Sequence, residues 1–263
     1  MASEKELNKY YSKFQEEKRL KTRHGTVEFI TSMKFIHNYA DLLNKPYSEI
    51  KIVDIGAATG AYSVPLSKEG FDVTAVELCK HNLEVLESKH EKIKIWPGNA
   101  LDLSFLPEDK FDIAILFGPL YHLHKKEEKL QAISQARRVL KNGGILLACY
   151  IMNDYAVISY CFGEKKINEA IENHTLDENF MSNENANSLY SYVRLSNIDE
   201  IQAECGMKRL ELFAQDGSAN YIRPVLNSLS EQEFNQFVNY HLATCQLPEL
   251  LGASTHVVDV LQK

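Results

Sequence analysis

The sequence predicts an α/β fold in which helices cover both faces of a mainly parallel sheet. From residue 50 onward, short apolar runs alternate with amphipathic stretches of helical period. Strands that alternate with helices at this spacing need crossover connections, which place neighbouring strands parallel. The first apolar run also ends in an acid, Asp54, and then breaks into a turn with glycines at positions 56 and 60. A strand that stops in this way leaves backbone N–H groups and a helix N-terminus facing a ligand.

Two amphipathic helices are expected before the first strand. Apolar residues recur at helical spacing in two stretches separated by residues 23–25, and Thr26 is the expected N-cap of the second helix. The residues that form these two apolar stripes are Leu7, Tyr10, Tyr11 and Phe14, followed by Phe29, Met33, Ile36, Ala40 and Leu43.

Seven apolar runs are expected to form strands, at residues 50–55, 71–76, 93–96, 111–117, 145–150, 207–213 and 255–261. Helices are expected from about residue 60, around 81–88, through 130–140, at 196–205 and from 230 onward. Capping boxes at 196–199 and 230–233 open the last two. The run Asn142-Gly143-Gly144 is the expected helix stop before the fifth strand, and Pro65 predicts an irregularity after the glycine turn.

Composition narrows the class of function. With 263 residues, of which 44% are hydrophobic, the chain can form one domain with insertions. A net charge of -7 argues against a surface that follows nucleic-acid phosphates. No apolar run reaches the length of a membrane span and the N-terminus has no apolar signal segment, so a cytoplasmic protein without a membrane partner is expected. The five scattered cysteines predict reduced thiols rather than a metal site or disulfides.

The glycine turn carries the most specific signal. Its pattern, Asp54-x-Gly56-x-x-x-Gly60, lacks the full G-x-G-x-x-G spacing of dinucleotide-binding proteins and places an acid two residues before the first glycine. It resembles the first motif of the class I (Rossmann-like) S-adenosylmethionine-dependent methyltransferases, small-molecule type, with Ala58 in place of the middle glycine. The resemblance implies S-adenosylmethionine as cofactor. It also implies a seven-stranded sheet whose last strand inserts antiparallel between the fifth and the sixth.

The same resemblance suggests how one methyltransferase domain, residues 1–263, is divided. The core is expected at about 48–151, 196–214 and 254–263. A helical cap over the site is expected from 1–45, 152–195 and 216–253.

Several residues are implied as cofactor ligands. Glu77 ends the second predicted strand, 23 residues after Asp54, where a carboxylate would accept hydrogen bonds from both ribose hydroxyls. Asn99 stands in a loop that resembles the adenine-edge loop of the family, with Leu78 and Leu101 on the two faces of the ring. The other cofactor residues implied are Tyr11, Arg23, Asp54, Gly56, Ala57, Gly60, Ala100, Phe117 and Gly118. Among them Arg23, in a segment that also holds Arg19, is expected to pair with the cofactor carboxylate.

The fourth predicted strand ends at residues that face the methyl donor. The run Gly118-Pro119-Leu120-Tyr121 lacks the amide or carboxylate of the Asn/Asp-Pro-Pro-Tyr motif, which argues against adenine-N6 chemistry and favours a small-molecule acceptor. His122 is the candidate general base, beside Tyr121; the alternative is a histidine that only packs or hydrogen-bonds. No third ligand accompanies His122 and His124, so no metal is expected. The residues expected to line the acceptor pocket are His24, Tyr192, Arg194 and Tyr221.

The sequence therefore predicts methyl transfer from S-adenosylmethionine to a nitrogen, or as second choice an oxygen, of a small molecule, by a monomer or homodimer with no nucleic-acid partner. Two alternatives stay open. A non-catalytic S-adenosylmethionine-binding protein would share the same cofactor motif. A nicotinamide-dependent oxidoreductase would need the regular glycine triplet and a second nucleotide-binding half, neither of which is visible in the sequence.

Overall fold

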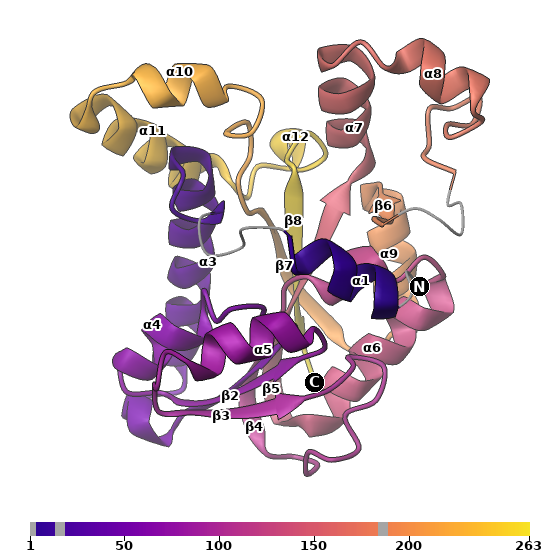
Figure 1. The fold of residues 1–263 in the computed structure, drawn as a ribbon. Coiled ribbons are helices and arrows are strands. Elements are labelled where there is room, and N and C mark those ends of the chain that lie inside the picture. The colour runs from indigo at the N-terminus through magenta and orange to yellow at the C-terminus, as the bar shows by residue number, and fades with distance from the viewer. Residues whose placement is uncertain (1–3, 14–18, 184–188) are drawn as a thin grey trace.

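The computed structural model describes residues 4–13, 19–183 and 189–263, and these form one mixed sheet of eight strands (Figure 1). The strands are β1 (Lys51–Ile55), β2 (Asp72–Glu77), β3 (Ile93–Pro97), β4 (Phe111–Leu116), β5 (Leu140–Met152), β6 (Tyr192–Val193), β7 (Lys208–Ala214) and β8 (His256–Gln262). Their order is β3-β2-β1-β4-β5-β8-β7, and the two-residue β6 pairs with β5.

The strand directions confirm the predicted fold class. Strands β1 to β5 are parallel, whereas β8 runs antiparallel between β5 and β7. From β1 the chain moves outward in one direction through β2 to β3, and from β4 in the other direction to β5. Right-handed crossovers therefore place the intervening helices of the two halves on opposite faces of the sheet.

Burial explains why these runs form central strands. All six residues of β4 are buried, and β1 and β2 are buried apart from their first residues. A strand that is covered on both faces needs a continuous apolar sequence rather than an alternating one, and the sequence Phe-Asp-Ile-Ala-Ile-Leu of β4 nearly meets this requirement. Asp112, near the amino end of β4, forms ion pairs with the ammonium groups of Lys45 and Lys141.

The longer helices are α1 (Glu4–Tyr11), α3 (Arg23–Leu42), α5 (Lys80–Glu87), α6 (Lys126–Val139), α9 (Leu195–Glu204) and α11 (Glu231–Thr244). The shorter ones are α4 (Ser63–Lys68), α7 (Asn153–Ala156), α8 (Ile167–Glu172), α10 (Arg223–Ser228) and α12 (Pro248–Leu251). Helical turns of other types are η1 (Tyr47–Glu49), η2 (Pro119–His122) and the π-helical η3 (Val157–Gly163).

The helices outside the sheet layers gather at one end of the molecule. Figure 1 shows α10 and α11 beside α3, α7 and α8 on the other side of β8, and α1 across the front near α5. A small apolar cluster that includes Val27, Leu226 and Phe234 holds α3 against α10 and α11. Helix α3 is joined to the sheet by Phe35, whose ring stacks on Phe213 of β7 with centroids 3.8 Å apart.

Several helix boundaries differ from the prediction. Thr22 rather than Thr26 caps α3, because its Oγ1 accepts a hydrogen bond from Gly25 N, so the helix begins four residues earlier. Helix α4 begins at Ser63, and Pro65 lies in its first turn. Val64 N donates to Gly60 O and Leu66 N donates to Tyr62 O, so the helical bond that Pro65 cannot donate is missing between them, as the predicted irregularity requires.

The other boundary corrections lie in the second half. Helix α6 ends at Val139, ahead of the predicted glycine stop, because Leu140 is already extended and pairs with Phe111 in the sheet. Helix α9 is capped at Arg194 instead of Ser196, and Asn197 Oδ1 accepts from Arg194 N. The capping box between Ser230 and Glu233 is confirmed.

Two further expectations can be compared with the structure. All five cysteines lie in described segments and are free thiols, as predicted. Across the three described ranges, no helix combines the length and the apolar character that crossing a membrane requires. Phe14, expected on the first helix, lies outside the described residues.

Candidate functional site

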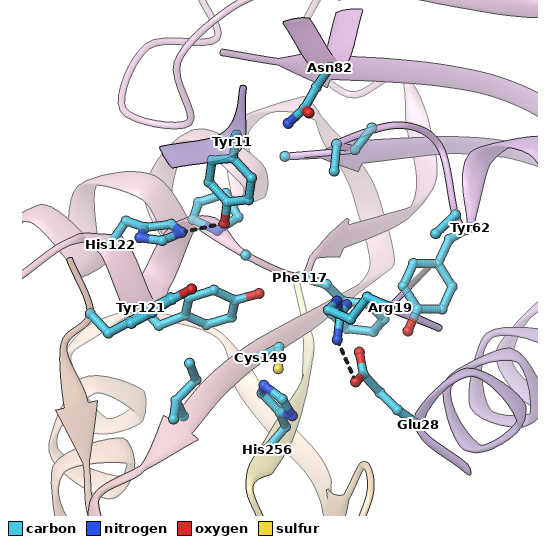
Figure 2. Close-up of a pocket in the computed structure, with 18 of the residues that line it drawn as sticks. Tyr11, Arg19, Glu28, Tyr62, Asn82, Phe117, Tyr121, His122, Cys149 and His256 are labelled. Atoms are coloured by element: carbon cyan, nitrogen blue, oxygen red, sulfur yellow. Dashed lines mark hydrogen bonds and ion pairs between the residues drawn. The ribbon is translucent and has the colours of Figure 1, made fainter. Parts of the chain in front are cut away.

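A cavity of about 470 Å³ opens at the carboxyl ends of the parallel strands (Figure 2). Its walls come from α1, α3, the turn after β1, the ends of β2 and β4, and residues 190–192. Because β8 runs antiparallel, its first residue, His256, reaches the same edge of the sheet. Open α/β sheets bind their ligands at this edge, and the volume lies in the range of small-molecule sites.

The turn after β1 closes tightly under the cavity. Gly56, Ala58 and Gly60 all have left-handed backbones, with φ of 81°, 47° and 88°. The N–H groups of Gly56 and Ala57 donate to Val76 O, and Ala58 N donates to Glu77 Oε2 at 2.8 Å. Ala58 therefore holds a conformation that a glycine would adopt without steric cost.

This conformation predicts that Ala58→Gly raises the free energy of unfolding by up to about 1 kcal/mol, because relief of the left-handed strain exceeds the entropy gained by the unfolded chain. Urea unfolding measures the change. The neighbouring Ala57 is not left-handed, so Ala57→Gly is the matched control and is expected to destabilise by roughly 0.5–1 kcal/mol. Equal destabilisation by Ala58→Gly and Ala57→Gly would contradict a strained left-handed backbone at Ala58.

Glu77 ends β2 with a buried carboxylate whose orientation is fixed. Oε1 accepts from Cys79 N at 2.7 Å and from Asn82 Nδ2 at 3.4 Å, while Oε2 accepts from Ala58 N. Burial raises the pKa of Glu77, and these donors act against that rise. Carboxylate oxygens hold several lone-pair sites, so acceptor capacity is left for a ligand. Asn82 Oδ1, which is buried at the same end of the cavity, has no hydrogen-bond partner among the described residues.

Asp54 lies behind the turn and is 2% exposed. Its Oδ2 accepts a hydrogen bond of 2.6 Å from Ser63 Oγ, at the first residue of α4. Burial raises the pKa of Asp54 to about 6. The carboxyl group thus ties the end of β1 to the start of the next helix, and it also lines the cavity.

His122 is almost fully buried and both ring nitrogens are engaged. Nδ1 lies 2.9 Å from Leu189 O, which can only accept, so Nδ1 carries the proton. Nε2 is then the acceptor for the hydroxyl of Tyr11, also at 2.9 Å (Figure 2). Burial lowers the pKa of His122 to about 4. The lone pair that a general base would use is therefore occupied by Tyr11, a geometry that favours holding α1 over the cavity.

The buried neutral state of His122 predicts a pH-dependent stability. Between pH 6.5 and about 4 the unfolded imidazole binds a proton that the folded one does not, so stability falls as pH falls through this window. The difference in unfolding free energy between wild type and His122→Asn is expected to narrow by about 2 kcal/mol from pH 7 to pH 5. Urea titrations of both proteins at the two pH values measure it, and a constant difference would contradict a neutral buried His122.

The other end of the cavity carries a second group of ionisable side chains. Glu28 of α3, 5% exposed, pairs with Arg19 at 2.6 Å, and His256 pairs through Nδ1 with the buried Asp216 at 2.8 Å. Thr255 Oγ1 is buried there without a partner in the described part of the chain. The sequence reasoning missed Asp216 and His256 altogether. The antiparallel last strand was the available signal, because its first residue must lie at the ligand edge.

Most of the predicted site residues lie on this cavity. They are Tyr11, His24, Asp54, Gly56, Ala57, Glu77, Leu78, Asn99, Ala100, Phe117, Gly118, Tyr121, His122 and Tyr192. Asn99 Oδ1 accepts from Leu101 N in a local turn, and its second lone pair leaves acceptor capacity for a ligand.

Five predicted site residues do not line the cavity. Arg23 donates to Leu226 O and Leu229 O and pairs with Glu231, so Arg19 is the arginine of this segment that faces the cavity. Arg194 pairs with Asp154 of α7. The remaining three turn elsewhere: Gly60 toward Leu86, Leu101 toward the main core, and Tyr221 toward Tyr155.

Comparison with known proteins gives a consistent result. Residues 53–148 match the family described as "Methyltransferase domain". A putative methyltransferase of Geobacillus sp. (strain WCH70) is 33% identical over 102 residues, 37% of this chain and 40% of the relative. The glycine/sarcosine N-methyltransferase of Parasynechococcus marenigrum is 28% identical over 110 residues, 40% of this chain and 39% of the relative. The chain thus spans about two fifths of the length of these relatives.

A solved structure extends the likeness to most of the fold. A protein described as a SAM-dependent methyltransferase from Methanosarcina mazei superposes with a TM-score of 0.56 at 16% identity, covering 87% of this chain and 96% of that one. The likeness therefore includes the strands beyond residue 148 as well as the matched segment.

Proposed function

We propose that this chain, in which residues 53–148 match the methyltransferase-domain family on a fold shared with a solved methyltransferase, transfers the methyl group of S-adenosylmethionine to a nitrogen or an oxygen of a small molecule. The observation that carries the proposal is the cavity itself, in which the glycine turn and Glu77 occupy one end and ionisable side chains the other. Within the second group, the buried pair of Asp216 and His256 supports catalysis over binding alone.

The residues at the turn fit the adenosyl part of the cofactor. Glu77 keeps acceptor capacity on both oxygens and Asn82 Oδ1 needs a donor, so two ribose hydroxyls would complete both. Gly118 lines the cavity without a side chain, which lets a ligand approach the backbone closely, whereas the missing side chain of Gly56 makes room for Pro119. Arg19 is placed to pair with the methionine carboxylate, the role that the sequence suggested for Arg23.

When bound, the cofactor supplies an electrophilic methyl group on a sulfonium. Transfer is an in-line displacement, so the protein contributes mainly by holding the two reactants close and aligned. Phe117 and Tyr62, which meet edge to face with centroids 5.2 Å apart, form an apolar wall between the two ends of the cavity. Tyr11, held by His122, closes the cavity from above and restricts water.

A small acceptor is proposed because both reactants must share about 470 Å³. The acidic net charge of -7 gives no support to a nucleic-acid substrate.

Isothermal calorimetry with S-adenosylhomocysteine tests the cofactor assignment, and binding in the micromolar range is expected. Tight binding of a nicotinamide cofactor with no heat from S-adenosylhomocysteine would overturn the proposal in favour of an oxidoreductase. A panel of small amines and phenols, read by formation of S-adenosylhomocysteine, then separates nitrogen from oxygen acceptors.

A further inference from the structure

The acceptor end of the cavity contains a histidine whose proton is fixed by a buried carboxylate. Asp216 is fully buried and each of its oxygens accepts two hydrogen bonds. Oδ1 accepts from Ser254 Oγ at 2.9 Å and from His256 N at 3.0 Å, and Oδ2 accepts from Asn220 Nδ2 at 2.7 Å and from His256 Nδ1 at 2.8 Å. A carboxylate held by four donors cannot turn away from the imidazole.

This arrangement fixes the tautomer of His256. Because Asp216 accepts from Nδ1, the neutral ring carries its proton there and its lone pair on Nε2. The side chain is 13% exposed, and that surface lines the cavity. Figure 2 shows the ring pointing into the pocket beside Cys149. His256 thus differs from His122, whose two nitrogens are both engaged by the protein.

The groups around the ring support a proton acceptor. Two carboxylates, Asp216 and Glu28, outweigh the burial of the ring and the charge of Arg19, so the pKa of His256 is raised. Burial raises the pKa of the Cys149 thiol, which stays neutral. The ring centroids of Tyr121 and His256 lie 6.2 Å apart. Tyr121, a residue of η2, therefore borders the His256 ring on that side. A base whose pKa lies near the working pH is the most effective in proton transfer.

We propose that His256 is the general base of the methyl transfer and that Asp216 positions it, an inference that rests on the proposed function. The acceptor is then a molecule whose reacting atom bears a proton, a hydroxyl or an amine. As the bond from the acceptor atom to the methyl carbon forms, the carbon–sulfur bond breaks and its electron pair stays on sulfur as a thioether. The proton of the acceptor passes to His256 Nε2, and Asp216 balances the imidazolium charge.

The sheet topology supports this assignment. The parallel strands deliver the cofactor residues to their carboxyl ends, and only a strand of opposite direction brings its first residue to the same edge. His256 therefore stands on a rigid strand, paired with Ile151 of β5. A base on a strand is held more precisely than one on a loop.

The first test needs no acceptor. Histidine labelled with ¹⁵N allows the tautomer and pKa of His256 to be measured by NMR, with His256→Gln giving the resonance assignment. We expect a proton on Nδ1 and a pKa above 6.5 in wild type, falling in Asp216→Asn. An unprotonated Nδ1 or a pKa at or below 6.5 in wild type would overturn the proposal, whether or not the Asp216 variant folds.

The second test uses the panel of amines and phenols. His256→Gln is expected to lower turnover roughly 100-fold or more and to remove the acidic limb of the pH–rate profile, with S-adenosylhomocysteine affinity unchanged. In wild type, the acidic limb of the pH–rate profile should appear with a phenol and with an amine if both are acceptors. His37→Gln is the matched control, because His37 lies on the surface of α3 beside Glu69, away from the cavity, and it should leave turnover unchanged.

Two outcomes would overturn the assignment of the base. Turnover of His256→Gln within threefold of wild type would exclude His256 from proton transfer. Loss of activity in EDTA with recovery on adding a divalent cation would instead assign Glu28, Asp216 and His256 to a metal, since their ligand atoms lie within 4.8 Å of one another. Calorimetry with S-adenosylhomocysteine does not depend on His256, so failure of the proposed function is distinguishable from failure of the base.

Discussion

Glu77→Ala is expected to weaken binding of S-adenosylhomocysteine by roughly 100-fold or more. Each hydrogen bond to a charged group contributes about 1.5–3 kcal/mol, and two ribose hydroxyls would lose their acceptor together. The substitution also removes the acceptor of the N–H groups of Ala58 and Cys79, so the turn that supports the ligand loses its alignment. Calorimetric titration of S-adenosylhomocysteine measures the change in Kd.

A carboxylate on the neighbouring helix provides the control for this experiment. Glu84 of α5 is exposed and pairs only loosely with Lys80, at 3.7 Å. Glu84→Ala should therefore bind S-adenosylhomocysteine like wild type. A Kd for Glu77→Ala within threefold of the control would remove Glu77 from the cofactor site, provided that urea unfolding shows both variants folded.

Gly56→Ala is expected to lower the free energy of unfolding by about 3 kcal/mol and to abolish measurable cofactor binding. A methyl group at this position would lie 2.6 and 2.7 Å from two ring carbons of Pro119. The left-handed backbone adds about 1–2 kcal/mol, and overpacking typically another 1–3 kcal/mol. Because Pro119 begins η2, relief of the clash would move the end of β4 away from the turn after β1.

The variant Gly143→Ala separates the cost of the left-handed backbone from the cost of overpacking. The φ of 78° at Gly143 is close to the 81° of Gly56, but a Cβ there would meet no atom within 4 Å. Gly143→Ala should therefore show only the backbone cost. If urea unfolding showed the same loss of unfolding free energy for Gly56→Ala and Gly143→Ala, the contact with Pro119 would be relieved without cost.

The sheet and the turn could be predicted because they depend on local pattern. A strand buried on both faces must be apolar along its length, and the spacing between Asp54 and Glu77 follows from one strand–helix–strand unit. Helix starts were less predictable. Thr22 and Thr26 are both capable caps, and only the three-dimensional path before α3 selects Thr22.

The parts of the site that were missed depend on contacts between distant segments. Arg19 and Arg23 are close in the sequence and either could have been expected at the cavity. Arg23 instead donates to carbonyl oxygens more than 200 residues away. The hydroxyl of Tyr11 donates to Nε2 of His122, which is 111 residues away in the sequence. This hydrogen bond occupies the lone pair that His122 would need to act as a general base. Asp216 and His256 meet only because β8 enters between β5 and β7.

The position of β8 also determines the order in which the sheet can assemble. Among the strands of the described residues, β7 pairs only with β8, although it precedes β8 in the chain. During synthesis, the strands from β1 to β5 can pair as they emerge, whereas β7 must wait for residues 256–262. A nascent chain that has not reached residue 256 can therefore already hold the turn after β1. His256 arrives with the strand that completes the sheet, so the base is in place only once the fold is closed.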